Sequence, residues 1–216
     1  IGVVRGRALA VAQTTGVGND TLTGIENVVS GSGNDRLTGD TADNSLTAGA
    51  GNDTLSGGAG NDVMDGGTGT DLGDFSGATS VTVSLATASA QATGLGNDTL
   101  AGIENLLSGS GNDTLLGDGG NNTLTAGSGN DTVAGGLGND LMDGGIGTDT
   151  ADFTGITAVV VNLGLAVAQT TGLGSDTLSN FENVISGSGN DRLTGSALDN
   201  SLHGGAGDDS LLGGAG

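Results

Sequence analysis

Residues 48–65 read AGAGNDTLSGGAGNDVMD, which is one nine-residue pattern written twice. Each copy has glycine at its second and fourth positions, Asp at its sixth and a large apolar residue at its eighth. The pattern runs from residue 30 through SGSGNDRLT, GDTADNSLT, AGAGNDTLS, GGAGNDVMD and GGTGTDLGD. It returns from residue 108 as SGSGNDTLL, GDGGNNTLT, AGSGNDTVA, GGLGNDLMD and GGIGTDTAD, and from residue 186 as SGSGNDRLT, GSALDNSLH and GGAGDDSLL. Self-similarity at a fixed short period predicts a repeat architecture.

A longer period of 78 residues is superimposed, because Asp35, Asp113 and Asp191 are equivalent. It predicts repeat blocks at 31–75, 109–153 and 187–216, the last truncated, with spacers at 76–108 and 154–186 and the end of another at 1–30. We expect these parts to form one continuous solenoid. Neither end carries a recognisable cap, which solenoids need for solubility, so we expect a segment of a longer repeat protein.

The spacers have a pattern of their own, with Phe75 followed by alternating apolar residues and a closing GLGNDTLAGIEN. From Asp71 to Asp98 there are 27 residues, or three nonapeptides, so we expect the spacer to continue the coil. From Asp98 to Asp113 there are 15, three short of two nonapeptides, which predicts one tightened half-turn.

Within a nonapeptide, the first six residues favour a turn, because glycine tolerates positive φ and leaves room for inward-facing carbonyls. The last three form a minimal strand with one apolar side chain pointing inward. A strand and a turn every nine residues predict a coil with two strands and 18 residues per turn. Successive turns then stack their strands in parallel about 4.8 Å apart.

The composition excludes several classes of protein. There are 25 acidic residues against four basic ones, for a net charge of −21, with 47 glycines and no cysteine. Nucleic acid and anionic membrane surfaces need Lys and Arg, and a thiolate zinc site or disulfide scaffold needs Cys. No apolar run has the roughly 18 residues of a membrane span. Clustered carboxylates and free carbonyls suit a hard divalent cation.

Residues 18 apart become neighbours in such a coil, which places Asp35 over Asp53 over Asp71 on one edge and Asn44 over Asp62 on the other. Unit charges about 5 Å apart repel by roughly 3 kcal/mol at an effective dielectric near 20. Calcium takes six to eight oxygens at about 2.3–2.6 Å, and two stacked turns offer about that number. The spacing therefore predicts calcium between successive turns.

The blocks AGAGNDTLS and GGAGNDVMD resemble the repeats-in-toxin (RTX, haemolysin-type) calcium-binding nonapeptide G-G-x-G-x-D-x-U-x, where U is a large apolar residue. The resemblance covers 13 nonapeptides. It implies an all-β, right-handed parallel β-roll with calcium in rows between turns. It also implies type I secretion of an unfolded chain that folds in extracellular calcium.

Carried over by position, the resemblance implies that sixth-position side chains and second- and fourth-position carbonyls bind calcium. In the first block these residues are Gly31, Gly33, Asp35, Asn44, Gly49, Gly51, Asp53, Gly58, Gly60, Asp62, Gly67, Gly69 and Asp71. In the second they are Gly109, Gly111, Asp113, Asn122, Gly127, Gly129, Asp131, Gly136, Gly138, Asp140, Gly145, Gly147 and Asp149, and in the third Gly187, Gly189, Asp191, Asn200, Gly205, Gly207 and Asp209. Asn44, Asn122 and Asn200 replace Asp, so we expect weaker or empty sites there.

Other singled-out residues favour structural roles. We expect Met64 and Met142 in the core and the Phe75 and Phe153 pair where the nonapeptide rule lapses. His203 is solitary, which favours a surface position. Glu26, Glu104 and Glu182 recur at the tightened half-turn, where capping of backbone groups is favoured over metal binding. No nucleophile and base can be paired, so we expect no enzyme.

The sequence leaves two main functions open. The first is a calcium-binding structural repeat region of a secreted bacterial protein, such as an adhesin, surface layer or extracellular fibre. The second is the calcium-dependent secretion and folding module of a type I secreted enzyme or toxin. The 78-residue tiling and uncapped ends favour the first. Its partners are calcium ions and, as candidates, further copies of the repeat or other surface proteins. Ice binding would need a regular rank of Thr, and the third positions Ser32, Ala50, Ala59 and Thr68 do not keep one.

Overall fold

The computed structural model describes residues 11–14, 19–22 and 25–216, which form strands and turns. No helix long and apolar enough to cross a membrane occurs in these ranges. The chain folds as two compact units, Ile1–Ser108 and Gly109–Gly216.

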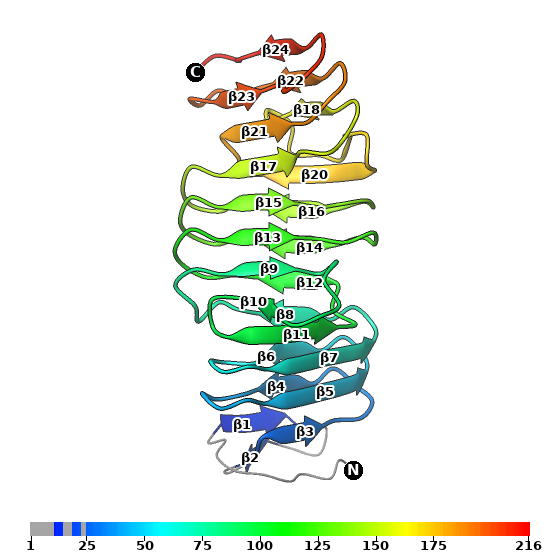
Figure 1. Ribbon diagram of the computed structural model, residues 1–216, viewed down its shortest axis with the longest axis vertical. Helices are drawn as coiled ribbons and strands as arrows, with labels where there is room; N and C mark the ends of the chain where they lie inside the picture. The colour runs from blue at the N-terminus through cyan, green and yellow to red at the C-terminus, as the bar shows by residue number, and fades with distance from the viewer. Residues whose placement is uncertain (1–10, 15–18, 23–24) are drawn as a thin grey trace. The chain divides into compact units, whose positions relative to one another are not determined.

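Strands of the first unit stack into two mainly parallel sheets (Figure 1). In one, the order is β10-β11-β7-β5-β3, with β3 (Asn27–Val29), β5 (Ser45–Ala50), β7 (Val63–Thr68) and β11 (Asn97–Ala101) parallel and β10 (Gln91–Ala92) antiparallel to β11. In the other, β4 (Arg36–Thr38), β6 (Thr54–Ser56), β8 (Leu72–Asp74) and β12 (Asn105–Leu107) are parallel. The antiparallel hairpin of β1 (Val11–Thr14) and β2 (Asn19–Leu22) adjoins β4, and β9 (Thr82–Ser84) lies beside β10.

Gly109–Gly216 is likewise built of stacked, mainly parallel strands, which belong to three sheets. The first contains β13 (Thr114–Leu116), β15 (Thr132–Ala134), β17 (Thr150–Phe153), β21 (Asn183–Ser186) and β23 (Ser201–His203), all parallel. The second contains β14 (Thr123–Thr125), β16 (Leu141–Asp143) and β20 (Ser175–Ser179), with β19 (Gln169–Thr170) antiparallel to β20. The third contains β18 (Val160–Asn162), β22 (Arg192–Thr194) and β24 (Ser210–Leu212).

Strand register confirms the predicted coil. Within the blocks each strand pairs with the strand one turn later, as Leu37 does with Leu55 and Leu46 with Met64. Hydrogen bonds between successive turns likewise join residues 18 apart. The chain is therefore an all-β parallel β-roll with 18 residues per turn in its repeat blocks.

The spacers do not wind as three nonapeptide half-turns, so that prediction is wrong. Strand β11 stacks directly on β7, with Leu100 opposite Met64, 36 residues away instead of 18. After β8 the chain does not add the next strand of these two sheets. It forms β9, whose counterpart β18 in the second unit pairs in parallel with β22, and returns through the β10–β11 hairpin, so that β10 lies between β11 and β9 (Figure 1). An antiparallel return can use a tight hairpin, and the nonapeptide count could not reveal that reversal.

The tightened half-turn is confirmed. Only six residues separate the inward Leu100 of β11 from the inward Leu106 of β12, whereas nine separate Leu46 from Leu55. Leu106 then pairs with Gly73 of β8, 33 residues earlier. The step from Asp98 to Asp113 is short because this half-turn lacks three residues of a nonapeptide.

The core is the column of eighth-position side chains, which are fully or almost fully buried: Leu37, Leu46, Leu55, Met64, Leu115, Leu124, Val133, Met142 and Leu193. Where the eighth position is Gly73, the ring of Phe75 occupies the space, since a Cβ on Gly73 would lie 3.2 Å from Phe75 Cε2. Phe75 and Phe153 are each 3% exposed, and His203 is exposed. The predicted roles of the methionines, these two phenylalanines and His203 are confirmed.

Replacing Leu55 by Ala should lower the free energy of unfolding by about 2–5 kcal/mol, because the deleted side chain leaves a cavity between stacked turns. Urea denaturation of the calcium-saturated chain measures this. Val63→Ala is the matched control, since Val63 lies on a neighbouring strand with 45% of its surface exposed. Equal losses in the two variants would contradict the inward column.

Candidate metal centre

Turns between strands bring bare backbone into close contact with the turn below. Gly58 and Gly60 have φ of 91° and 120°, which L side chains rarely adopt. A Cβ on Gly58 would overlap the carbonyl oxygen of Asp40, and a Cβ on Gly60 would lie 2.7 Å from the carbonyl oxygen of Ala42. Second- and fourth-position carbonyl oxygens therefore lie between successive turns, as predicted.

The second-position carbonyls have a partner that the sequence did not suggest. The N–H of Ala59 donates to the Asp40 carbonyl at 2.9 Å, and that of Ile146 donates to the Gly127 carbonyl at 2.8 Å. A carbonyl oxygen has two lone pairs. One lone pair of each such carbonyl remains for a metal.

Sixth-position carboxylates form the ladders that the 18-residue spacing predicts. The N–H of Asp35 donates to Asp53 Oδ1 at 2.7 Å, and that of Asp53 donates to Asp71 Oδ1 at 2.7 Å. On the other edge the N–H of Asn44 donates to Asp62 Oδ1 at 2.8 Å. In the second unit the same bonds run from Asp113 to Asp131 at 2.7 Å, from Asp131 to Asp149 at 2.8 Å, from Asn122 to Asp140 at 2.9 Å and from Asp191 to Asp209 at 3.0 Å.

Only one oxygen of each such carboxylate is used in these ladders. The Oδ2 atoms without a hydrogen-bond partner are buried and include those of Asp53, Asp62, Asp71, Asp131, Asp140, Asp149 and Asp191. A buried charged oxygen left without a partner costs more than the roughly 1–3 kcal/mol of a neutral group. The ladder is incomplete without a cation.

First-position glycines are explained by the same oxygen, and not by positive φ. A Cβ on Gly57 would overlap Asp62 Oδ2, and a Cβ on Gly135 would overlap Asp140 Oδ2. Neither glycine has a positive φ. The carboxylate thus folds back over the start of its own turn.

The donor chemistry fits calcium. The available atoms are carboxylate and carbonyl oxygens, which hard cations prefer. Among the described residues no three His, Cys, Asp or Glu side chains converge on one point. Backbone carbonyls must therefore supply most donors, which calcium's six to eight oxygen ligands permit.

Comparison with known families agrees with this geometry. The model of the RTX calcium-binding nonapeptide repeat matches residues 23–41, 38–72, 93–133, 116–151 and 185–216. The chain belongs to the RTX calcium-binding nonapeptide repeat family. Repeats of this family bind calcium, several ions in each repeat region. A comparison with curated proteins gave no match.

Asparagine side chains at the sixth position turn into their own half-turns in this RTX array. Oδ1 of Asn44 accepts the N–H of Asp40 at 2.8 Å, and Oδ1 of Asn200 accepts that of Ser196 at 2.6 Å. The Nδ2 of Asn44 is buried without a hydrogen-bond partner. An amide donor in that place repels a cation, so a weaker site at these turns stays our prediction.

A second ladder, at the fifth position, was missed in the sequence. The N–H of Asn52 donates to Asn34 Oδ1 at 2.9 Å, and that of Thr70 donates to Asn52 Oδ1 at 3.1 Å. In this ladder a side chain of the lower turn accepts a hydrogen bond from an N–H of the upper turn. In the Asp ladder a side chain of the upper turn accepts from an N–H of the lower turn. Its signal was the recurrent Asn before Asp in GNDTL and GNDVM. Adjacent residues thus join each pair of turns in both directions without metal.

Glu104 and Glu182 of the tightened half-turns cap backbone N–H groups, as predicted for them. Glu104 Oε2 accepts the N–H of Asp71 at 2.8 Å, and Glu182 Oε2 accepts that of Asp149 at 2.8 Å. Each takes the place that an Asp of the next nonapeptide would have. The longer side chain compensates for the three missing residues.

Burial raises the pKa of several ladder carboxylates and so disfavours their ionised form. Burial raises the pKa of Asp62 from 3.8 to about 6; the N–H of Asn44 opposes this and the charge of Asp98 adds to it. Burial likewise raises the pKa of Asp140 and of Asp149 to about 6. A bound cation would remove this cost.

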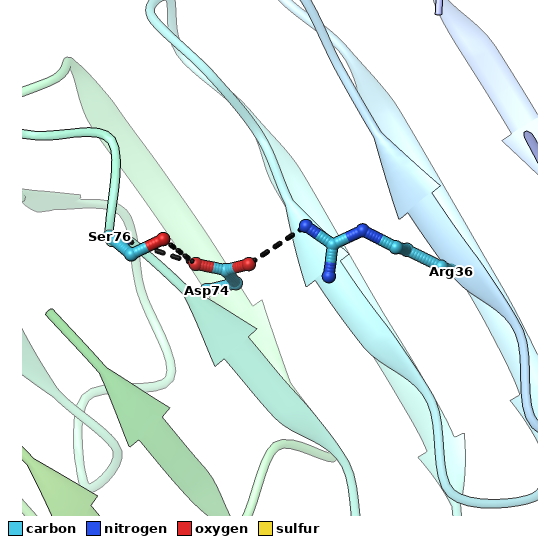
Figure 2. Close-up of polar contacts among 3 residues, drawn as sticks. All are labelled: Arg36, Asp74 and Ser76. Atoms are coloured by element: carbon cyan, nitrogen blue, oxygen red, sulfur yellow. Dashed lines mark hydrogen bonds and ion pairs between the residues drawn. The ribbon is translucent and has the colours of Figure 1, made fainter. Parts of the chain in front are cut away.

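Asp74 shows the opposite arrangement (Figure 2). Burial alone would raise its pKa, but the Ser76 hydroxyl donates at 2.6 Å, the Ser76 N–H at 3.1 Å and the Arg36 guanidinium at 2.9 Å, which together hold the pKa below its ordinary value. Its charge is satisfied within the protein. Asp74 therefore forms a structural ion pair with Arg36, which joins β8 to β4.

Gly136→Ala should reduce calcium affinity and stability, since its Cβ would overlap the Asp118 carbonyl at a φ of 90°. Because both φ and packing are violated, we expect a loss of about 1–3 kcal/mol. Calcium titration followed by circular dichroism measures it. Gly119→Ala is the control, because nothing lies within 4 Å of its Cβ position. Equal tolerance of both substitutions would contradict the stacked turns.

Without calcium, the fold should gain stability as the pH falls from about 7 to about 5. Asp62, Asp140 and Asp149 have folded pKa values near 6, above 3.8 in the unfolded chain, so the folded state binds more protons in this window. That stabilisation is fully present below pH 3.8 and is lost as pH rises through about 6. Circular dichroism in calcium-free buffer should show β structure increasing on acidification. The triple variant to Asn should show a weaker dependence, and a decrease in the unsubstituted chain would refute the assignment.

Proposed function

We propose that this RTX chain is a calcium-stiffened structural repeat region of a secreted bacterial protein such as an adhesin, surface layer or extracellular fibre. The observation that supports it is the series of buried carboxylate oxygens without hydrogen-bond partners on consecutive half-turns, as at Asp53, Asp62 and Asp71. These oxygens recur with the 78-residue period, as in Asp53 and Asp131 or Asp62 and Asp140. A long tiled array suits an extended support.

Calcium drives folding in this proposal. The 47 glycines carry a high conformational entropy cost, and the apolar column supplies only one inward side chain per half-turn. Each ion that binds only the folded form adds to stability by mass action. Extracellular repeat modules bind calcium at about 10⁻⁴ to 10⁻³ M. The chain then remains unfolded before secretion and folds outside the cell.

A non-catalytic role belongs to the same proposal. The buried carboxylates are taken up by the ladders or, at Asp74, by an ion pair. His203 lies exposed on β23, and its pairing neighbours are the strand residues of β21. The sequence pairs no nucleophile with a base. The alternative remains a secretion and folding module of a type I secreted enzyme or toxin, which an adjacent catalytic domain in the same gene would favour.

Circular dichroism during a calcium titration tests the proposal. The signal of β structure should appear steeply between about 10⁻⁴ and 10⁻³ M calcium and disappear on chelation. Magnesium at the same concentrations is the control, because it demands a small octahedral site and keeps its waters. A β signal that is unchanged by chelation, or produced equally by magnesium, would sink the proposal.

A further inference from the structure

The half-turns that carry Asp98 and Asp176 differ from the Asp62 and Asp140 half-turns on which they stack. Asp98 Oδ1 accepts the N–H of Asp62 at 2.9 Å, and Asp176 Oδ1 accepts that of Asp140 at 2.9 Å, so both continue the ladder. Both carboxylates are 1% exposed. They are as buried as the ladder carboxylates below them.

Their second oxygens, however, have a partner. The hydroxyl of Thr93 donates to Asp98 Oδ2, and the hydroxyl of Thr171 donates to Asp176 Oδ2. Both threonines are fully buried, at 0% exposure. The corresponding Oδ2 of Asp62, one rung below, is without a hydrogen-bond partner. A buried hydroxyl thus does for Asp98 what a cation would do for Asp62.

The backbone of these half-turns also changes. A Cβ on the fourth-position Gly96 would overlap the carbonyl of Gly60 below, as in an ordinary turn. A Cβ on the second-position Gly94 would instead lie 2.5 Å from the carbonyl oxygen of Ser80, which belongs to the same spacer. Gly172 has the same relation to Ala158 in the second unit, also at 2.5 Å. The fourth-position glycine therefore keeps its contact with the turn below, whereas the second-position glycine contacts a carbonyl of its own spacer instead.

The spacer around each Thr–Asp pair is held by contacts that need no metal. Val81 and Val83 are buried at 2% and 0% exposure. The Gln91 side chain accepts the N–H of Ser84 at 2.7 Å and donates to its carbonyl at 2.8 Å. Gln169 makes the same pair of bonds with Asn162. Each Thr–Asp pair is thus placed by a packed, hydrogen-bonded element.

We propose that Thr93 with Asp98, and Thr171 with Asp176, are locks that end a calcium row. In them the carboxylate is a structural acceptor and not a calcium ligand. On the opposite edge of the same turns, Glu104 accepts the N–H of Asp71 and Glu182 accepts that of Asp149, which ends the rows of Asp carboxylates there. Calcium binding is therefore divided into short rows, one set per 78-residue period. This inference rests on the proposed calcium-binding function.

Two pairs of substitutions in the full 216-residue chain test the locks. Asp98→Asn with Asp176→Asn keeps Oδ1 for the N–H below and gives Thr93 and Thr171 an amide donor, since their hydroxyls can also accept. We expect the number of bound calcium ions and the half-saturating concentration to stay within about twofold of the unsubstituted chain. Asp62→Asn with Asp140→Asn removes the partnerless carboxylates, so bound ions should be lost or half-saturation raised about tenfold or more. Equilibrium dialysis and calorimetry with calcium measure both.

Loss of as many ions in the Asp98 and Asp176 variant as in the Asp62 and Asp140 variant would overturn the locks while leaving calcium binding intact. An unsubstituted chain that binds no calcium would overturn the proposed function and the locks together. The two failures are therefore distinguishable.

Substitution of the threonines gives a second readout. Thr93→Val with Thr171→Val should lower the thermal midpoint of the calcium-saturated chain without loss of bound ions. Thr82→Val is the matched control, because Thr82 is exposed and the equivalent residue of the second spacer is Val160. Release of calcium by the threonine variant while it stays folded would show that the locks belong to metal sites, against the proposal.

Discussion

Along one edge of the repeat blocks, buried carboxylates stack on one another in successive turns, as Asp35, Asp53 and Asp71 do, and unit charges about 5 Å apart repel by roughly 3 kcal/mol. The backbone N–H that each Oδ1 accepts offsets part of this cost, as between Asp35 and Asp53. The second oxygen has no such partner at Asp53, Asp62 or Asp71. We therefore propose that a cation meets that oxygen at these three residues, whereas at Asp35 the Ser30 hydroxyl donates to it.

Three environments distinguish chemically identical aspartates along the chain. Ladder carboxylates such as Asp62 keep one oxygen without a partner and have a pKa near 6. Asp74 is satisfied by Arg36 and Ser76, and its pKa is lowered. Asp98 is satisfied by a buried threonine hydroxyl. Aspartates with satisfied carboxylates occur in a repeat block, as at Asp74, and in a spacer, as at Asp98.

The glycines serve this arrangement in two distinct ways. Second- and fourth-position glycines adopt positive φ and let carbonyls of neighbouring turns approach, as at Gly58. First-position glycines leave space for the carboxylate of their own turn, as Gly57 does for Asp62. Both uses cost conformational entropy on folding. A narrow apolar column offers little to offset that cost, which is why we propose that calcium binding is coupled to folding.

The sequence by itself determined the periodic part of this protein. An 18-residue turn places Asp35 under Asp53 and Leu46 beside Met64, because two nine-residue half-turns bring equivalent positions of successive turns together. The same count predicted the tightened half-turn and the backbone-capping role of Glu104. Only the tertiary structure decided the non-periodic part. It placed Asp98 above Asp62 across 36 residues, reversed the chain through β10, and brought Thr93 onto Asp98. The 36-residue step and the chain reversal depend on how the spacer packs around the buried Val81 and Val83, which the nonapeptide count does not describe. The Thr93 contact is local, like that of Ser30 with Asp35, but only the structure shows that the hydroxyl meets the second carboxylate oxygen.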